Sequence, residues 1–372
     1  MGPFPHDAPP AKITVDNPMG TDGFEFVEYA HPNPAELHAL FRLMGYTPVA
    51  RHRTKNITLY RQGDINYLVN EAAGTHGFDF VAAHGPCAPS MAFRVVDAKL
   101  AYERALSLGA EPADVTSAQK TLDVPAIKGI GGSLLYFVDR YGAKGSAFDA
   151  EFEWLGEKNP RPEGAGLFYL DHLTHNVHRG RMDVWTGFYE RLFNFRQIRF
   201  FDIEGRASGL FSRALTSADG KIRIPINEDA GDAGQIEEYL TTYRGEGIQH
   251  IACGVKDIYR TIEKLRADGL PFMPPPPSTY FDKIDARLPK HGEDVARLQK
   301  NGILIDGEGV VEGGETKVLL QLFSANAIGP IFFEFIQRKG DDGFGEGNFK
   351  ALFESIEEDQ IRRGVLHMKG AA

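Results

Sequence analysis

Met91-Ala-Phe-Arg-Val-Val-Asp97 and Ile251-Ala-Cys-Gly-Val-Lys-Asp257 share one pattern, a mostly apolar strand that ends at an aspartate before a helical stretch. Two further pairs of segments match in the same order along the chain. They are Leu68-Val-Asn-Glu71 with Pro225-Ile-Asn-Glu228, and Ser133-Leu-Leu-Tyr-Phe-Val-Asp-Arg-Tyr-Gly142 with Ile331-Phe-Phe-Glu-Phe-Ile-Gln-Arg-Lys-Gly340. Internal similarity of this kind indicates a duplicated structural unit.

Around these segments, hydrophobic periodicity predicts a strand, a helix and then three strands, and this order is used four times. We therefore expect an α+β fold with two similar half-open barrel domains, each built from two βαβββ modules. A barrel of this kind encloses a cavity suited to a small molecule. The stretch from 271 to 316, which contains Pro274 to Pro277, is predicted to be an insertion with one or two short helices.

Composition and the positions of Pro- and Gly-rich stretches divide the chain into four predicted parts. Residues 1–22 are predicted to be a flexible N-terminal arm, and 23–156 an N-terminal domain without metal that serves structure or oligomerisation. Residues 157–166 combine charge, Pro and Gly, which is typical of a linker. Residues 167–372 are predicted to be the catalytic domain. It ends in a helix over Phe349–Arg363, capped by Asn348 and terminated by Gly364, that would act as a lid.

Charge and cysteine content exclude several classes of protein. The chain has 372 residues and a formal net charge of −10, which argues against nucleic-acid binding. The two cysteines, Cys87 and Cys253, cannot form a disulfide framework, so a reducing cytoplasm is the expected location. No apolar run is long enough to span a bilayer, so no membrane association is expected.

Comparing the two halves singles out three residues. His172, His250 and Glu334 lie in apolar strand patterns of the second half, whereas Ser90 and Tyr136 stand where His250 and Glu334 would fall in the first half. A buried carboxylate needs a positive partner, and no Lys or Arg lies within three residues of Glu334. Two histidines and one carboxylate form the facial triad of non-haem Fe(II) oxygenases, so we predict a metal site.

The histidines leave an alternative open. A single histidine in a strand is more often a core or surface residue than a ligand. His175 and His178 also lie near His172 in sequence. Strand parity puts His175 on the opposite face and His178 near the strand end, which favours His172 as the ligand.

Polar and aromatic residues of the second half are the candidates for substrate contacts. Ser212, Asn227, Gln235 and Gln321 supply hydroxyl and amide groups in otherwise apolar surroundings, which suits a phenol or keto acid. Phe332 shares a strand face with Glu334. Phe344 and Phe349 lie in the glycine-rich tail from Arg338 to Phe349, which predicts a hinge before the lid.

The sequence resembles the bacterial type of the 4-hydroxyphenylpyruvate dioxygenase family from about Gly23 to Gly364. The segments that carry the resemblance are Leu170-Asp-His-Leu-Thr-His-Asn-Val177, Gly245-Glu-Gly-Ile-Gln-His250, Arg287-Leu-Pro, Gly329-Pro-Ile-Phe-Phe-Glu-Phe-Ile-Gln-Arg-Lys-Gly-Asp-Asp-Gly-Phe-Gly-Glu-Gly-Asn-Phe349 and Leu352-Phe-Glu-Ser-Ile356. The wider superfamily of such paired modules, the vicinal oxygen chelate fold, also contains glyoxalases and extradiol dioxygenases.

The resemblance implies one Fe(II) per subunit, held by His172, His250 and Glu334, with O₂ as co-substrate. It implies conversion of 4-hydroxyphenylpyruvate to homogentisate and CO₂ in tyrosine and phenylalanine catabolism, through oxidative decarboxylation, ring hydroxylation and side-chain migration. It adds Gln249 to the substrate contacts, assigns catalytic roles to Gln321, Asn227 and Gln235, and implies a homodimer or homotetramer.

Three alternatives remain at this point. A 4-hydroxymandelate synthase would use the same substrate and metal but hydroxylate the benzylic carbon. An extradiol ring-cleaving dioxygenase would use the same triad on a catechol without releasing CO₂. A binding or drug-sequestering module of the same fold would need no iron. The Phe332, Asn227 and Gln321 set resembles the pattern of the dioxygenase family, and this resemblance favours ring attack.

Overall fold

The first half of the chain contains eight of the strands in the computed structural model, which describes residues 8–205, 208–231, 234–310, 314, 316–364 and 366. The strands are β1 (Thr21–Ala30), β2 (Thr47–His52), β3 (Ile57–Gln62), β4 (Ile65–Asn70), β5 (Cys87–Val95), β6 (Ala126–Lys128), β7 (Leu134–Val138) and β8 (Phe152–Trp154). The helices are α1 (Pro34–Leu43), α2 (His76–His84) and α3 (Ala98–Ser107), with 3-10 turns at Ile130–Gly132, Gly142–Lys144 and Ala147–Asp149.

The second half repeats this order with additions. Its strands are β9 (Leu167–Asn176), β10 (Arg196–Glu204), β11 (Gly209–Thr216), β12 (Arg223–Asp229), β13 (Gly247–Val255), β14 (Leu304–Val310), β15 (Thr316–Phe323) and β16 (Phe332–Lys339). Its helices are α4 (Met182–Phe193), α5 (Gln235–Tyr243), α6 (Ile258–Ala267), α7 (Ser278–Phe281), α8 (Ile284–Arg287), α9 (Val295–Asn301) and α10 (Glu346–Arg362).

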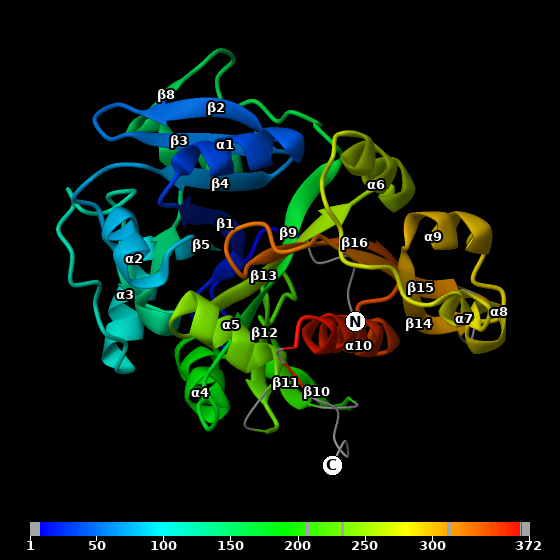
Figure 1. Ribbon diagram of the computed structural model, residues 1–372. Helices are drawn as coiled ribbons and strands as arrows, with labels where there is room; N and C mark the ends of the chain where they lie inside the picture. Colours follow the sequence, from blue (N-terminus) through cyan, green and yellow to red (C-terminus); the bar gives the residue numbers. More distant parts are fainter. Residues whose placement is uncertain are drawn as a thin grey trace.

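In the described residues the strands form two eight-stranded mixed sheets, one from each half (Figure 1). Their orders are β6-β7-β5-β1-β4-β3-β2-β8 and β10-β11-β12-β9-β13-β16-β15-β14. In every module the first strand pairs in parallel with the last, as in β1 with β4 and β13 with β16. The two modules of a half meet through an antiparallel pair, β1 with β5 or β9 with β13. The predicted α+β duplicated fold is confirmed.

Two details differ from the sequence-based expectation. The second module of the first half has two strands after its helix rather than three, and β8 instead joins the far edge of the sheet beside β2. The stretch predicted as an insertion holds three short helices, α7 to α9, and its last part is the sheet strand β14. Gly307 and Gly309 weaken the strand pattern there, and the β14–β15 register shifts between them.

The core lies between the two sheets. Tyr29 of β1 packs against Phe333 of β16 with ring centroids 6.4 Å apart, and the Tyr67 hydroxyl lies 3.2 Å from Cys253 Sγ. Because side chains alternate along a strand, residues next to these in sequence point to the opposite face of each sheet. That opposite face lines the interior of each half-barrel.

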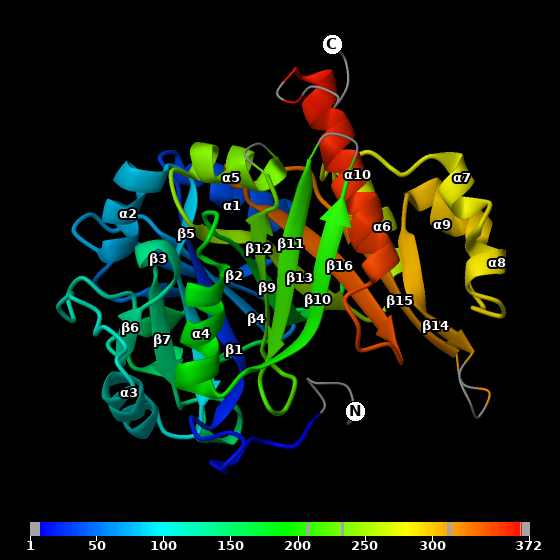
Figure 2. The same ribbon diagram turned by 90° about the horizontal axis from the view of Figure 1, so that it is seen from below.

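The interior of the first half-barrel is filled by its own side chains. Phe26 packs on Tyr136 at 5.6 Å between centroids and on Phe148 at 6.3 Å, within a buried cluster that also contains Phe152. In the second half the corresponding space is closed instead by helix α10. This helix lies between the β10–β11 side and the β14–β15 side of the sheet in both views (Figures 1 and 2).

The chain boundaries predicted from composition stay predictions. Residues 157–166 carry no helix or strand, and residues 1–7 lie outside the described part. The described helix α10 begins at Glu346, so Asn348 is inside the helix and is not its cap, contrary to expectation. Gly364 follows the helix with φ of 75°, a left-handed value that suits a helix end. No helix of the described residues is long and apolar enough to cross a membrane.

We predict that Gln62→Ala loosens the contact between the halves. The Gln62 side chain is fully buried, accepts hydrogen bonds from the Ala165 and Leu167 amides at 2.5 and 3.2 Å, and donates to the Met44 carbonyl at 3.0 Å. Removing it leaves three buried backbone groups unpaired, at a cost of about 1–3 kcal/mol for each group that finds no other partner. Thermal denaturation should show a lower midpoint, while the exposed control Gln197→Ala should leave it unchanged. Equal midpoints would contradict this.

Candidate metal centre

The three predicted ligands come from neighbouring strands, because the register of the sheet brings them together. Ala252 of β13 lies directly opposite His172 of β9 on one side and Glu334 of β16 on the other. His250 precedes Ala252 by two residues on β13 and therefore shares its face. The small Ala252 side chain leaves the space in which the longer side chains of His172 and Glu334 converge.

The donor atoms of these three side chains converge on one point. His172 Nε2 lies 3.1 Å from Glu334 Oε2, His250 Nε2 lies 3.3 Å from the same oxygen, and the two Nε2 atoms are 3.3 Å apart. All three residues are buried, with exposed fractions of 3%, 6% and 2% for His172, His250 and Glu334. In the described residues this is the group of three or more His, Cys, Asp or Glu side chains that could hold a metal ion.

The hydrogen bonds at the far side of each imidazole turn both Nε2 atoms toward Glu334, and His250 Nε2 also lies 2.9 Å from the Thr174 hydroxyl. His172 Nδ1 donates to Asp171 Oδ1 at 2.8 Å, and His250 Nδ1 donates to Gln249 Oε1 at 3.0 Å. In the neutral rings both Nε2 atoms then carry lone pairs directed at a carboxylate oxygen, an arrangement that is repulsive without a cation. Metal bonds of about 2.1 Å at right angles would separate ligands by about 3 Å, so the donor set fits a divalent ion.

The electrostatics of the three groups are coupled. Burial opposes the ionisation of Glu334, but the neighbouring His172 outweighs it and lowers the pKa of Glu334 to about 2. Burial also opposes the charged form of His172, yet Glu334 and Asp171 raise the pKa of this histidine above its usual value. Burial lowers the pKa of His250. The carboxylate is therefore ionised, and its charge favours a proton on His172 that a metal ion would compete with.

The first half carries different side chains at the corresponding positions of the same register. Ala92 of β5 lies opposite Phe26 and Tyr136, just as Ala252 lies opposite His172 and Glu334. Ser90 stands at the position of His250. Phe26, Ser90 and Tyr136 thus occupy the three ligand positions, and the two aromatic side chains fill the space.

The alternative histidines lie elsewhere. His175 faces the core between the sheets, as parity predicts, and its Nε2 lies 2.7 Å from the Tyr189 hydroxyl. His178 is exposed just after β9, and its backbone amide donates to Glu246. Neither side chain belongs to the group around Glu334.

Four of the predicted substrate residues line the same small cavity as the triad. They are Ser212, Asn227, Gln321 and Phe344. Gln321 Nε2 donates to Glu334 Oε1 at 2.8 Å, and Asn227 Oδ1 is buried and has no hydrogen-bond partner among the described residues. The Phe344 ring stands edge-on to His172 at 5.5 Å. The free volume is about 30 Å³, far below the ~300–1,000 Å³ of ordinary ligand pockets.

The other predicted contacts are placed differently. Gln235, Gln249 and Phe332 line a neighbouring cavity of about 460 Å³ beside the end of α10, so Gln235 is not brought into the small cavity. Gln249 connects the two cavities, because its Oε1 also accepts a hydrogen bond from Asn227 of the small cavity at 3.3 Å. Phe332 stacks on His250 at 4.9 Å. Phe349 lies in α10, but its side chain is outside the described residues.

Sequence reasoning missed some of the surrounding residues. Thr174, Phe201 and Pro225 also line the small cavity. Arg338, buried on the same strand as Glu334, forms a two-pronged ion pair with Asp171 at 2.7 and 2.8 Å. The search for a positive partner covered three residues on each side of Glu334, and Arg338 is the fourth. Asp171 directly precedes His172 in the segment Leu170–Val177. Arg338 could have been found from strand parity, because it shares a face with Glu334. Asp171 could not, because the register shift between Ala252 and Cys253 makes it the extra residue of a bulge in β9.

Comparison with known proteins assigns the family. The model described as "Hydroxyphenylpyruvate dioxygenase, HPPD, N-terminal" matches residues 15–153. The model described as "Glyoxalase/Bleomycin resistance protein/Dioxygenase superfamily" matches residues 169–294. A 4-hydroxyphenylpyruvate dioxygenase from Pseudomonas sp. (strain P.J. 874) is 54% identical over 352 residues, 94% of this chain and 98% of that protein. This chain belongs to the 4-hydroxyphenylpyruvate dioxygenase family.

Some similar proteins are named differently from 4-hydroxyphenylpyruvate dioxygenase. Hemolysin VllY from Vibrio vulnificus (strain CMCP6) is 55% identical over 360 residues, 95% of this chain and 99% of that protein. A solved structure of a 4-hydroxymandelate synthase variant from Streptomyces coelicolor superposes with a TM-score of 0.77 at 24% identity, covering 91% of this chain and 99% of that one. At that identity the similarity shows the fold.

We predict that Ala252→Leu weakens metal binding in this family member by at least about tenfold, because the larger side chain separates His172 from Glu334. Anaerobic titration with Fe(II) measures the affinity. The matched control is Ala92→Leu, which crowds the corresponding point of the first half and should destabilise the fold without changing the affinity. Unaltered binding by Ala252→Leu would contradict the ligand geometry.

We predict that His175 makes the metal-free protein sensitive to acid. Burial lowers the pKa of His175 to about 3 in the folded chain, while the unfolded chain takes up this proton below about pH 6.5. Stability is therefore lost as the pH falls from about 6.5 toward 3, by up to about 1.4 kcal/mol per pH unit from this group. His175→Gln should show a shallower loss between pH 6 and 4.5 in urea unfolding, with metal binding retained. Identical slopes would contradict the assignment.

Proposed function

We propose that this protein is an Fe(II)-dependent 4-hydroxyphenylpyruvate dioxygenase that converts 4-hydroxyphenylpyruvate and O₂ to homogentisate and CO₂. The observation that carries the proposal is the convergence of His172, His250 and Glu334 on one buried point in a member of this family. The equation balances, because one oxygen atom enters the new carboxylate and the other enters the ring.

The donor set supports iron in particular. Two imidazoles and one carboxylate on one face leave the other positions open, as non-haem Fe(II) oxygenases require. Ferrous iron bound there would supply a Lewis acid for the 2-oxo acid and a reductant for O₂. The chain's own residues set the ligands in place and keep the surroundings dry.

The charge of the cavity supports a keto-acid substrate held by the metal. Among the described residues that line the cavity, Ser212, Asn227 and Gln321 supply hydrogen-bonding groups, and none is a Lys or Arg. A substrate carboxylate in this place would find its positive partner only in the ion, since burying an unpaired carboxylate is costly. The amide and hydroxyl groups would then orient the phenol or the keto acid, while Phe332 and Phe344 would form apolar walls for the ring.

Access to the site requires movement of the tail. The cavity has about 30 Å³ of free volume, and Phe344 closes one side of it. The Phe344 carbonyl also accepts a hydrogen bond from Gln321 at 3.3 Å. We propose that the segment before α10 moves to admit the substrate and closes again to exclude water, which is the function of a lid.

The remaining parts of the proposal concern the whole protein. We propose a homodimer or homotetramer in which the first half serves structure or subunit contact. We place the protein in the cytoplasm, where its two buried free cysteines would stay reduced.

The decisive experiment combines metal content with product analysis. Anaerobic protein loaded with Fe(II) and given 4-hydroxyphenylpyruvate and then O₂ should release CO₂ and homogentisate in equal amounts. Glu334→Gln and His250→Ala should lose turnover at least about 10³-fold with unchanged circular dichroism, because each removes a ligand. 4-Hydroxymandelate as the product would favour the synthase. Turnover of a catechol without CO₂ would favour ring cleavage, and absence of metal binding would favour a binding module.

A further inference from the structure

The buried guanidinium of Arg338 contacts two parts of the site. One is Asp171, which supports the candidate metal ligand His172, and the other is the loop that leads to the proposed lid. Arg338 Nε and Nη2 donate to the two oxygens of Asp171 at 2.7 and 2.8 Å. Asp171 Oδ1 in turn accepts the Nδ1 proton of His172 at 2.8 Å. The Arg338 and Asp171 side chains are 0% and 1% exposed, so this ion pair is fully desolvated.

The remaining donor of Arg338 holds the tail of the chain. Arg338 Nη1 donates to the backbone carbonyls of Asp341 and Gly343, at 3.2 and 2.5 Å. These carbonyls belong to the loop that leads to Phe344 and then to α10. Because the guanidinium is a rigid planar fork, it fixes the loop relative to Asp171 in a way that a lysine could not.

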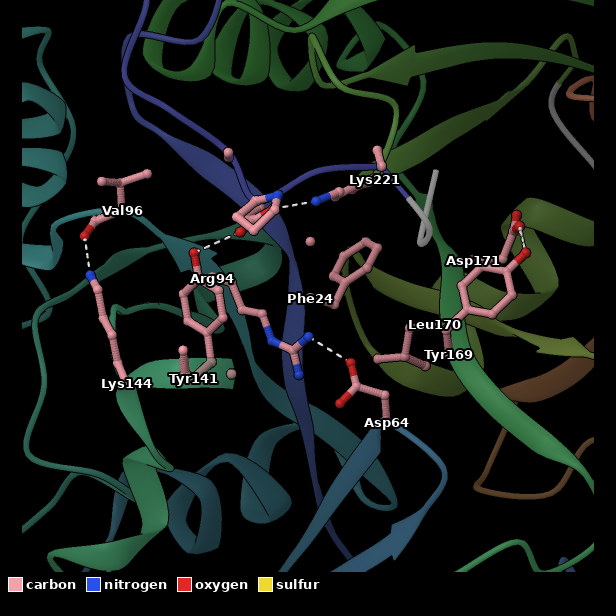
Figure 3. Close-up of a pocket in the computed structure, with 17 residues that line it drawn as sticks. Phe24, Asp64, Arg94, Val96, Tyr141, Lys144, Tyr169, Leu170, Asp171 and Lys221 are labelled. Carbon is pink, nitrogen blue, oxygen red and sulfur yellow. Dashed lines mark hydrogen bonds and ion pairs between the residues drawn. The ribbon is translucent and has the colours of Figure 1, made fainter. Parts of the chain in front are cut away.

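Neighbouring groups complete the surroundings of Asp171. The Tyr169 hydroxyl donates to Asp171 Oδ2 at 2.9 Å, and this pair lies at the wall of a cavity of about 390 Å³ between the two halves (Figure 3). Arg223 Nη1 lies 3.9 Å from Asp171 Oδ1, and its guanidinium stands 5.9 Å over the Phe344 ring. Asp171 therefore keeps its charge and its orientation with no help from solvent.

We infer that Arg338 and Asp171 are positioning residues that couple the metal ligand His172 to the lid loop 341–344. Asp171 fixes the ring orientation and tautomer of His172 and increases its basicity as a ligand, as carboxylates behind metal-bound histidines do. Arg338 holds Asp171 in place and anchors the loop that carries Phe344. Displacement of the loop 341–344 would therefore also disturb the support that Asp171 gives to His172. The inference rests on the proposed metal site.

The first half contains an ion pair, Arg94 with Glu25, that can serve as a control for the Arg338–Asp171 pair. Glu25 precedes Phe26 as Asp171 precedes His172, and it is paired with Arg94 at 2.5 Å. Glu25 is buried and Arg94 is partly buried, with side chains 4% and 15% exposed, and Arg94 also pairs with Asp64 at 2.6 Å. The residue after Glu25 is aromatic, and among the described residues Arg94 contacts no part of the tail 341–344. Arg94→Lys therefore removes a similar ion-pair geometry without touching a ligand.

The test measures metal affinity and loop protection rather than turnover alone. Anaerobic titration with Co(II), whose visible d–d bands report the ligand geometry, should show at least tenfold weaker binding and altered bands for Arg338→Lys and for Asp171→Asn. Hydrogen exchange across 341–345 should be faster in Arg338→Lys than in wild type. Arg94→Lys should keep the wild-type Co(II) affinity, bands and loop protection, although its melting temperature falls.

The outcomes separate this inference from the proposed function. If wild-type protein binds no Co(II) or Fe(II), the proposed metal site is wrong. If wild type binds metal and both Arg338→Lys and Asp171→Asn bind within twofold of it with unchanged bands, the positioning role is overturned. If Arg338→Lys does not fold, the test uses Asp171→Asn and the double variant Asp171→Asn with Arg338→Met instead. The double variant removes both charges of the pair, so neither is left buried without its partner.

Discussion

The burial of one carboxylate constrains the whole second half-barrel. Glu334 is 2% exposed and lies on a central strand, where an unpaired negative charge would destabilise the fold by several kcal/mol. Its Oε1 accepts a hydrogen bond from Gln321, and its Oε2 faces two imidazole nitrogens. Without a proton or a metal ion these groups would repel one another, so an ion bound here would take the place of the proton that Glu334 favours on His172. Stability and ligand affinity are therefore linked at this point.

The two halves share one backbone register but place different side chains in it. Both halves place a small residue, Ala92 or Ala252, at the centre of three strands, and both place three side chains around it. In the first half these side chains are two aromatics and a serine, which pack into a core. In the second they are two histidines and a carboxylate, which leave space. The same backbone thus produces a filled barrel or a binding site, depending on side-chain volume and polarity.

The duplicated fold and the triad could be predicted from the sequence because strand patterning and the comparison of halves are local signals. The assignment of His172 over His175 followed from strand parity. The placement of Gln235 beside a neighbouring cavity could not be predicted, because it depends on where α5 begins relative to β12. Strand β14 was missed because glycines break its pattern, and the Arg338–Asp171 pair because two distant strands bring it together.

The arrangement of charges also explains why the lid and the metal centre lie on one side of the sheet. Strand β16 carries Glu334 and Arg338 on the same face, so a single strand supplies a ligand and the anchor of the following loop. Burial favours the neutral form of Asp171, but Arg338 outweighs it and holds the pKa of Asp171 well below its usual value. In this conformation the ionised Asp171 accepts the Nδ1 proton of His172. What the loop can change is therefore the orientation of this support rather than its charge, and a rigid arginine fork transmits orientation well.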